Sequence, residues 1–221
     1  MARTVLIIFL LYLDLFCPAS AQDSRINLVL TLNTESADRA IALYEGLSGN
    51  PQQIAQLRGS QLALATTALL AQQELSTADL EHSLAAAKYN QTVDNDVFHV
   101  KEARGGAVAI KDLLVEIKRR NFAQKVIGTV EQLFPSDAQF STTIPVFFVA
   151  FGHSNIEAYV RRVTWQENVP IFPGEGEGEL TIVVNLSKSM SYGRTTDERF
   201  IGMMSIVAHE VFHAAFGAYK D

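Results

Sequence analysis

The segment from Thr195 to Phe216 constrains the fold more than any other part of this 221-residue chain. It begins Thr-Thr-Asp-Glu, which has the form of a capping box with Thr195 at the N-cap and Glu198 at the third helical position. It contains no proline and only one glycine. This pattern predicts a helix of about 20 residues, since the chain has a start signal and no breaker inside it.

The predicted helix has two different sides, because each residue is rotated by about 100° from the one before. Gly202 and Ser205 lie on one side, which is poor in bulky side chains and suits the floor of a cleft; both positions should therefore tolerate alanine. The opposite side is apolar and is expected to pack on a core. Its members are Phe200, Met204, Val207, Val211 and Ala215.

The cleft side of the same helix carries the sequence His-Glu-Val-Phe-His at positions 209–213, a match to the H-E-x-x-H pattern. Residues four apart lie on one face about one turn from each other, so His209 and His213 can bind one metal ion. From beside the metal, Glu210 can accept a proton from a zinc-bound water, whose pKa falls to about 7, and return it to a leaving amine. The alternative is a buried helix whose histidines only form hydrogen bonds. The pattern favours zinc over that alternative.

Residues 1–21 have the features of a secretory signal peptide. Arg3 supplies positive charge, residues 5–16 are largely apolar, and Ala19-Ser20-Ala21 is a cleavage signal of the A-x-A type. The apolar run is too short to span a bilayer, so no stable membrane anchor is expected after signal removal. We therefore expect a secreted or periplasmic protein. Its only cysteine, Cys17, would leave with the signal, and a core rather than disulfides must stabilise the mature chain.

The charge of the chain argues against one class of partner. The formal net charge is −6, and no basic stripe runs along any segment. Proteins that bind nucleic acid or anionic membrane surfaces usually carry a patch or stripe of lysine and arginine side chains. We therefore expect no nucleic-acid binding.

Hydrophobic periodicity divides the rest of the chain into a mainly helical region, 22–138, and a mixed region, 139–221. An α+β fold is therefore expected, in which the helical part precedes a sheet and the helix described above. Helices that cover the sheet and a separate helical subdomain both fit the pattern. Strands are predicted over 26–32, 144–151 and 180–186, and helices over about 35–47, from Pro51, and over 61–75, 76–88, 107–119 and 122–134.

The order of strand 180–186, the loop Lys188–Ser191 and the H-E-x-x-H helix resembles the core of the zincin metallopeptidases. The resemblance covers about residues 144–216 and is greatest to uncharacterised bacterial secreted proteins described as zinc-dependent proteases of the gluzincin type. It implies hydrolysis of peptide bonds in a peptide or protein substrate, with Zn2+ bound by His209 and His213 and with Glu210 as the general base. In zincins the strand before the helix lies at the sheet edge and pairs with an extended peptide. Strand 180–186 would be that edge, and Asn185 would bind the substrate backbone.

The third zinc ligand separates the subgroups of zincins. A metzincin has Gly three and His six residues after its second metal histidine, where this chain has Phe216 and Tyr219. A gluzincin takes its third ligand from a glutamate on a following helix, and only eight residues follow His213 here. The resemblance thus predicts a third ligand beyond residue 221 and an incomplete site in this chain alone. The alternative ligands lie upstream and are His153, Glu175, Glu177 and Glu179.

Two other classes of function are compatible with the sequence. One is a catalytically inactive, secreted, zincin-like binding protein. The other is a helical interaction module in which the H-E-x-x-H match is accidental. About one zinc ion per chain would support a metal site. Hydrolysis of an unfolded protein would then distinguish an enzyme from a binding protein.

Overall fold

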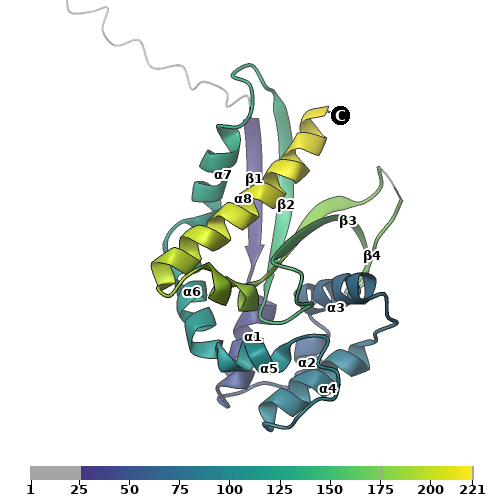
Figure 1. The fold of residues 1–221 in the computed structure, drawn as a ribbon. Helices are drawn as coiled ribbons and strands as arrows, with labels where there is room; N and C mark the ends of the chain where they lie inside the picture. Colours follow the sequence, from purple (N-terminus) through teal and green to yellow (C-terminus); the bar gives the residue numbers. More distant parts are fainter. Residues whose placement is uncertain (1–25, 175, 221) are drawn as a thin grey trace, which may run out of the picture.

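The computed structural model describes residues 26–174 and 176–220 (Figure 1). The expected signal peptide, residues 1–21, lies outside the described residues. Five strands form one sheet in the order β1-β2-β5-β3-β4, in which β1, β2 and β5 are parallel and β3 is antiparallel to β5 and β4. The predicted α+β class is confirmed. The strands are β1 (Ile26–Asn33), β2 (Phe140–Val149), β3 (Ala158–Gln166), β4 (Val169–Ile171) and β5 (Glu179–Asn185).

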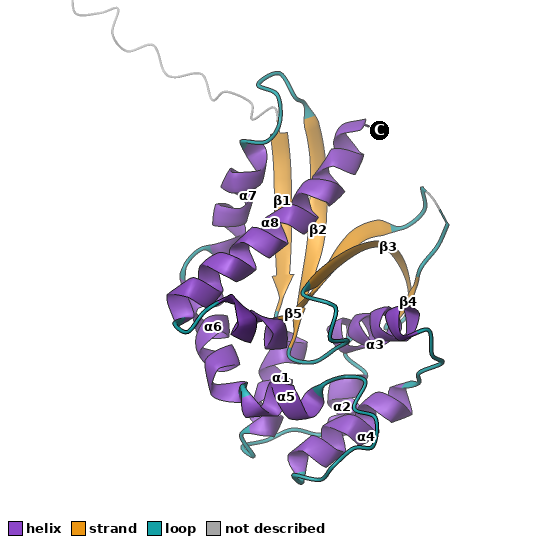
Figure 2. Cartoon of the chain, in the orientation of Figure 1, coloured by secondary structure: helices purple, strands orange, loops and turns teal. Residues whose placement is uncertain are grey.

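Helices cover both faces of the sheet (Figure 2). Successive side chains of a strand point to opposite faces. Phe148 of β2 contacts Phe122 of α7 at 5.9 Å between ring centroids, whereas Phe147 lies against Gly59 of α3. The α7 and α8 helices therefore pack on one face and α3 on the other. The helices are α1 (Glu35–Tyr44), α2 (Pro51–Ala55), α3 (Arg58–Ala71), α4 (Thr77–Lys88), α5 (Val100–Gly105), α6 (Ala107–Arg119), α7 (Phe122–Glu131), the 3-10 helix η1 (Leu186–Tyr192) and α8 (Thr196–Lys220).

Most of these elements agree with the prediction to within a few residues. The strands β3 and β4 and the short helices α5 and η1 were not among the predicted elements. One continuous cluster of buried hydrophobic residues joins the helical region to the mixed region, since it includes Leu84 and Leu113 as well as Val146 and Val207. The sheet itself is also shared, because β1 pairs with β2 along its whole length.

The predicted capping box at the start of α8 is confirmed. The Glu198 N–H donates to Thr195 Oγ1 at 3.2 Å, and the Thr195 and Arg194 N–H groups donate to Glu198 Oε2 at 2.9 and 2.7 Å. The Thr195 backbone bond, followed by the Arg194 bond, lowers the pKa of the Glu198 carboxyl. The helix then continues for 25 residues, somewhat longer than predicted.

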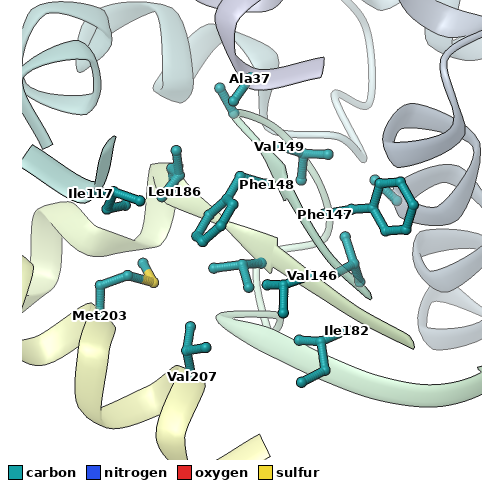
Figure 3. Close-up of a cluster of buried hydrophobic side chains, with 14 of the residues drawn as sticks. Ala37, Ile117, Val146, Phe147, Phe148, Val149, Ile182, Leu186, Met203 and Val207 are labelled. Carbon is teal, nitrogen blue, oxygen red and sulfur yellow. The ribbon is translucent and has the colours of Figure 1, made fainter. Parts of the chain in front are cut away.

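The predicted apolar side of α8 packs on the sheet. Val207, Val211 and Ala215 are fully buried, and Figure 3 shows Val207 pointing from α8 into the cluster of buried side chains that includes Ile182 of β5. Met204 is only half-buried, and the adjacent Met203 is buried in its place. By length and composition α8 could also cross a membrane. Its apolar composition is also what burial of one side against a sheet requires.

The opposite side of α8 differs from the prediction at Gly202. A Cβ atom at this position would lie 2.6 Å from the Cβ of Tyr192 in η1, so Gly202 is covered rather than open. The expectation that Gly202 lies on an open cleft floor and tolerates alanine is wrong. Helical rotation places a residue on a side of its own helix but does not show which neighbouring segment crosses there. Ser205 is exposed, as expected, and its hydroxyl donates to the Ile201 carbonyl oxygen at 3.0 Å.

Gly202→Ala is predicted to destabilise the protein by about 1–3 kcal/mol, because the added methyl group overlaps Tyr192. Gly128→Ala in α7 is the matched control, since nothing lies within 4 Å of its added Cβ. Alanine there should stabilise by about 0.4–1 kcal/mol through its helix propensity and the smaller entropy of the unfolded chain. Urea unfolding midpoints measure both effects. Midpoint shifts of the same sign would contradict the assigned contact.

Val211→Asp is predicted to cost about 3–5 kcal/mol, because it places an unpaired charge against the sheet. The control is Ile201→Asp on the same helix, where the replaced side chain is 55% exposed. Soluble yield and thermal unfolding followed by circular dichroism compare the two variants. A Val211→Asp protein as stable as the control would show that this side of α8 is not buried.

Candidate functional site

The side chains of His209 and His213 lie next to each other on the exposed side of α8. Their Nε2 atoms are 3.1 Å apart, and their ring centroids are separated by 4.6 Å. Two nitrogens bound to a tetrahedral zinc at about 2.0–2.1 Å are about 3.3–3.4 Å apart. The pair therefore fits one zinc ion with a small side-chain adjustment, provided that both Nε2 atoms are deprotonated and each proton is on Nδ1.

Glu210 lies between these histidines in sequence and lines a cavity of about 320 Å³. Because Glu210 is half-buried, its carboxylate is accessible from this cavity and yet partly shielded from solvent. The cavity is formed between α8 and the segment that leads into β3. Its lining residues are Ser154, Asn155, Glu157, Ala158, Ile206, His209 and Glu210.

A second cavity, of about 590 Å³, lies beside His213. It extends from α8 over β3 to the segment that connects β4 and β5. Leu69 of α3, Val160 of β3 and Leu180 of β5 give it a mainly apolar lining. Arg161 and Arg162 are its charged lining residues among those described, apart from the titratable His213. The two cavities therefore flank the histidine pair and have different chemistry.

The strand that runs along both cavities is β3. Ala158 lines the smaller cavity, and Val160 and Arg162 line the larger one. Residues 158–163 pair with β5 on one side, whereas β4 pairs only with residues 164–166 on the other. Within the described part of the chain, residues 158–163 have no partner strand on that second side. Among the described residues, this stretch is therefore an edge of the sheet beside the histidines.

The expectation that strand 180–186 is the sheet edge is wrong. This strand, β5, lies between β2 and β3 and pairs with both. Asn185 at its end is fully buried, and its Oδ1 accepts hydrogen bonds from the Ser187 N–H at 3.1 Å and the Ser187 hydroxyl at 2.7 Å. Asn185 therefore caps η1 and is not placed to bind a substrate backbone.

His153, an alternative third ligand, is held in the turn after β2. Its N–H donates to Thr67 Oγ1 at 3.2 Å, and its Nδ1 accepts from the Asn155 N–H at 3.2 Å. Burial, followed by the nearby His99 and Lys188, lowers the pKa of His153. Within residues 26–174 and 176–220, no three His, Cys, Asp or Glu side chains form a group that could hold a metal ion. His153, Glu177 and Glu179 are therefore not brought to the histidine pair, and Glu175 lies outside the described residues.

Two residues at the smaller cavity were missed by sequence reasoning. Glu157 lines the cavity, and Tyr192 of η1 lies beside this carboxylate. Burial, followed by the Glu157 carboxylate, raises the pKa of the Tyr192 hydroxyl above its usual range. No local pattern marks either residue, because they come together only through the positions of β3 and η1 beside α8.

Comparison with known proteins identifies a family. The family model described as "Putative zinc dependent peptidase (DUF5700)" matches residues 52–220, a segment that contains β2, β3, β5 and α8. No curated protein and no solved structure matches the chain. Because the matched segment covers well over half of the 221 residues, the chain belongs to the DUF5700 family, whose description names a zinc dependent peptidase.

Proposed function

We propose that the protein hydrolyses peptide bonds with a zinc ion bound by His209 and His213 and with Glu210 as the general base. The supporting observation is that the two Nε2 atoms lie 3.1 Å apart on one face of α8, and that the adjacent Glu210 lines a cavity. The membership in a family described by zinc-dependent peptidase activity agrees with this chemistry.

The residues of the chain have separate parts in this reaction. When bound, zinc would supply a water of lowered pKa and polarise the scissile carbonyl. Glu210 accepts the proton of the attacking water, and the scissile C–N bond breaks as Glu210 returns this proton to the amine nitrogen. Glu210 is half-buried and lines the smaller cavity, so its carboxylate can contact a substrate bound there.

The substrate would be an extended segment of a peptide or an unfolded protein. We infer that it pairs with the sheet edge formed by residues 158–163 of β3, rather than with β5. Main-chain hydrogen bonds to a sheet edge bind a strand without regard to its sequence, and the adjacent cavities can then receive its side chains. This edge lies along both cavities, so a peptide on it would cross the histidine pair.

The zinc site needs one further protein ligand. Catalytic zinc normally has three protein ligands and a water, and the part of the chain described in the structure brings together only the two histidines. We infer that a residue outside 26–174 and 176–220 supplies the third ligand. Secretion, which residues 1–21 suggest, belongs to the same proposal and rests on the sequence pattern alone.

Glu210→Gln is predicted to lower peptide hydrolysis by the zinc-loaded protein by about a hundredfold or more, with zinc affinity unchanged, because the change removes the proton acceptor and neither imidazole. Glu74→Gln, at an exposed carboxylate between α3 and α4, is the control and should keep full activity. Cleavage of a fluorescent casein-type substrate and the zinc content are measured together. Full activity in zinc-loaded Glu210→Gln would refute the assigned base. Peptide binding without cleavage by the wild type would favour the alternative, an inactive binding protein.

His209→Ala and His213→Ala are each predicted to abolish zinc binding, whereas His153→Ala should leave it unchanged. The reason is the 3.1 Å separation within the pair and the separate hydrogen bonds that hold His153 in its turn. The single imidazole left in either variant should bind zinc only weakly, with a dissociation constant above about 1 µM. Calorimetric titration of zinc measures all three variants. Submicromolar binding that disappears in His153→Ala would show that His153 is the third ligand.

A further inference from the structure

We propose that the smaller cavity selects a lysine or arginine side chain on the substrate residue whose amine leaves, and that Glu157 is the residue that selects it. This inference rests on the proposed peptidase function and names the substrate class of the same site. Three observations support it: the position of the smaller cavity next to Glu210, the direction in which β3 runs past both cavities, and the charge of the side chains that line the smaller cavity.

The position of Glu210 identifies which substrate residue lies in the cavity. Glu210 returns a proton to the leaving amine nitrogen, so the residue that carries this nitrogen must lie against Glu210. Glu210 and His209 line the smaller cavity, whereas His213 lines the larger one. The smaller cavity therefore receives a side chain from the amine side of the scissile bond, and the larger cavity receives one from the acyl side.

The direction of β3 is consistent with this assignment. The smaller cavity adjoins Ala158 at the start of β3, and the larger cavity adjoins Arg162 near its middle. A peptide with its acyl side near Arg162 and its amine side near Ala158 runs opposite to β3. It would thus add to the sheet as an antiparallel strand, which continues the antiparallel pairing of β3 with β5 and β4.

The charge of the smaller cavity favours a cation. Besides Glu210, its only ionisable acidic group is Glu157, and Glu157 forms no ion pair with any residue that the structure describes. Ser154 and Asn155 add polar groups beside it. A half-buried carboxylate without a cation is well suited to form a charge-assisted hydrogen bond with an ammonium or guanidinium group.

Tyr192 is placed to orient the Glu157 carboxylate. Its buried Oη has no well-formed hydrogen bond to another described residue, and Glu157 is the neighbouring acceptor. Packing against Gly202 fixes the tyrosine in turn. On the other side of the histidines, the described charged lining residues of the larger cavity include two arginines and no carboxylate. Among the described lining residues, the carboxylates that could bind a substrate cation thus lie on the amine side.

The test compares quenched fluorescent peptides that differ at one position, the residue on the amine side of the scissile bond, which is lysine, arginine, methionine or glutamate. The readout is the ratio of kcat/KM for the lysine and methionine peptides, which does not depend on the absolute activity of a variant. We expect a ratio of about ten or more for the wild type, because a shielded hydrogen bond to a charged group is stronger than one between neutral groups. Glu157→Gln should lower the ratio to about one, and Glu157→Lys should favour the glutamate peptide. Glu74→Gln should keep the wild-type ratio.

The first decisive measurement is the kcat/KM ratio of Glu157→Gln together with its zinc content. A wild-type ratio in Glu157→Gln would overturn the proposal, and so would loss of zinc from that variant, which would identify Glu157 as a metal ligand. The second measurement is the binding of the same peptides to Glu210→Gln by fluorescence anisotropy. Tighter binding of the lysine peptide without any hydrolysis by the zinc-loaded wild type would contradict the peptidase function and support the cation cavity. Equal binding of the lysine and methionine peptides, with hydrolysis intact, would contradict the cation cavity alone.

Discussion

The burial of one side of α8 against the sheet is the interaction on which the candidate site depends. Val207, Val211 and Ala215 are fully buried at helical spacing, so the rotation of α8 about its own axis is fixed by the core. With that rotation fixed, His209 and His213 must lie on the exposed side, next to each other. The positions of the two imidazoles thus follow from apolar packing. No polar contact other than the one between the rings themselves is needed to bring them together.

The sheet order provides the second part of the site. After β2 the chain turns back, and β3 lies outside β5 rather than beside β2. This places a strand with one free side along the exposed face of α8, where both cavities open. The same order places β5 between two strands, inside a sheet that helices cover on both faces. Its central residues, Ile182 to Val184, are accordingly all apolar and buried. Because β5 rather than β3 lies next to β2, β3 is the strand that can contact a substrate.

The sequence predicted what local patterns determine. The capping box at Thr195, the buried side of α8, and the strands β1, β2 and β5 each follow from a few adjacent residues. The identity of the edge strand does not, because strand order depends on contacts between segments far apart in sequence. In β3, moreover, Arg161 and Arg162 interrupt the alternation that indicates a half-buried strand. The zincin resemblance assigns the edge to the strand directly before the helix, 180–186, and no local pattern shows that β3 lies outside it. Glu157 could not be identified for the same reason, since its place beside α8 depends on where β3 runs.

Gly202 connects several features that the sequence did not predict, namely η1, the cap made by Asn185 and the position of Glu157. A position that has no bulky side chain suggests open space, yet here the space is filled by Tyr192 from η1. Any larger residue at 202 would displace this tyrosine, whose hydroxyl lies beside Glu157 at the smaller cavity. Because η1 follows directly after the cap made by Asn185, the buried amide of Asn185 also helps to place Tyr192. Asn185 is thus linked to the cavity through the backbone it caps rather than through contact with a substrate. Tyr192 thus links Gly202 of α8, the cap residue Asn185 and Glu157. Together these residues shape the side of the site where the leaving amine would lie.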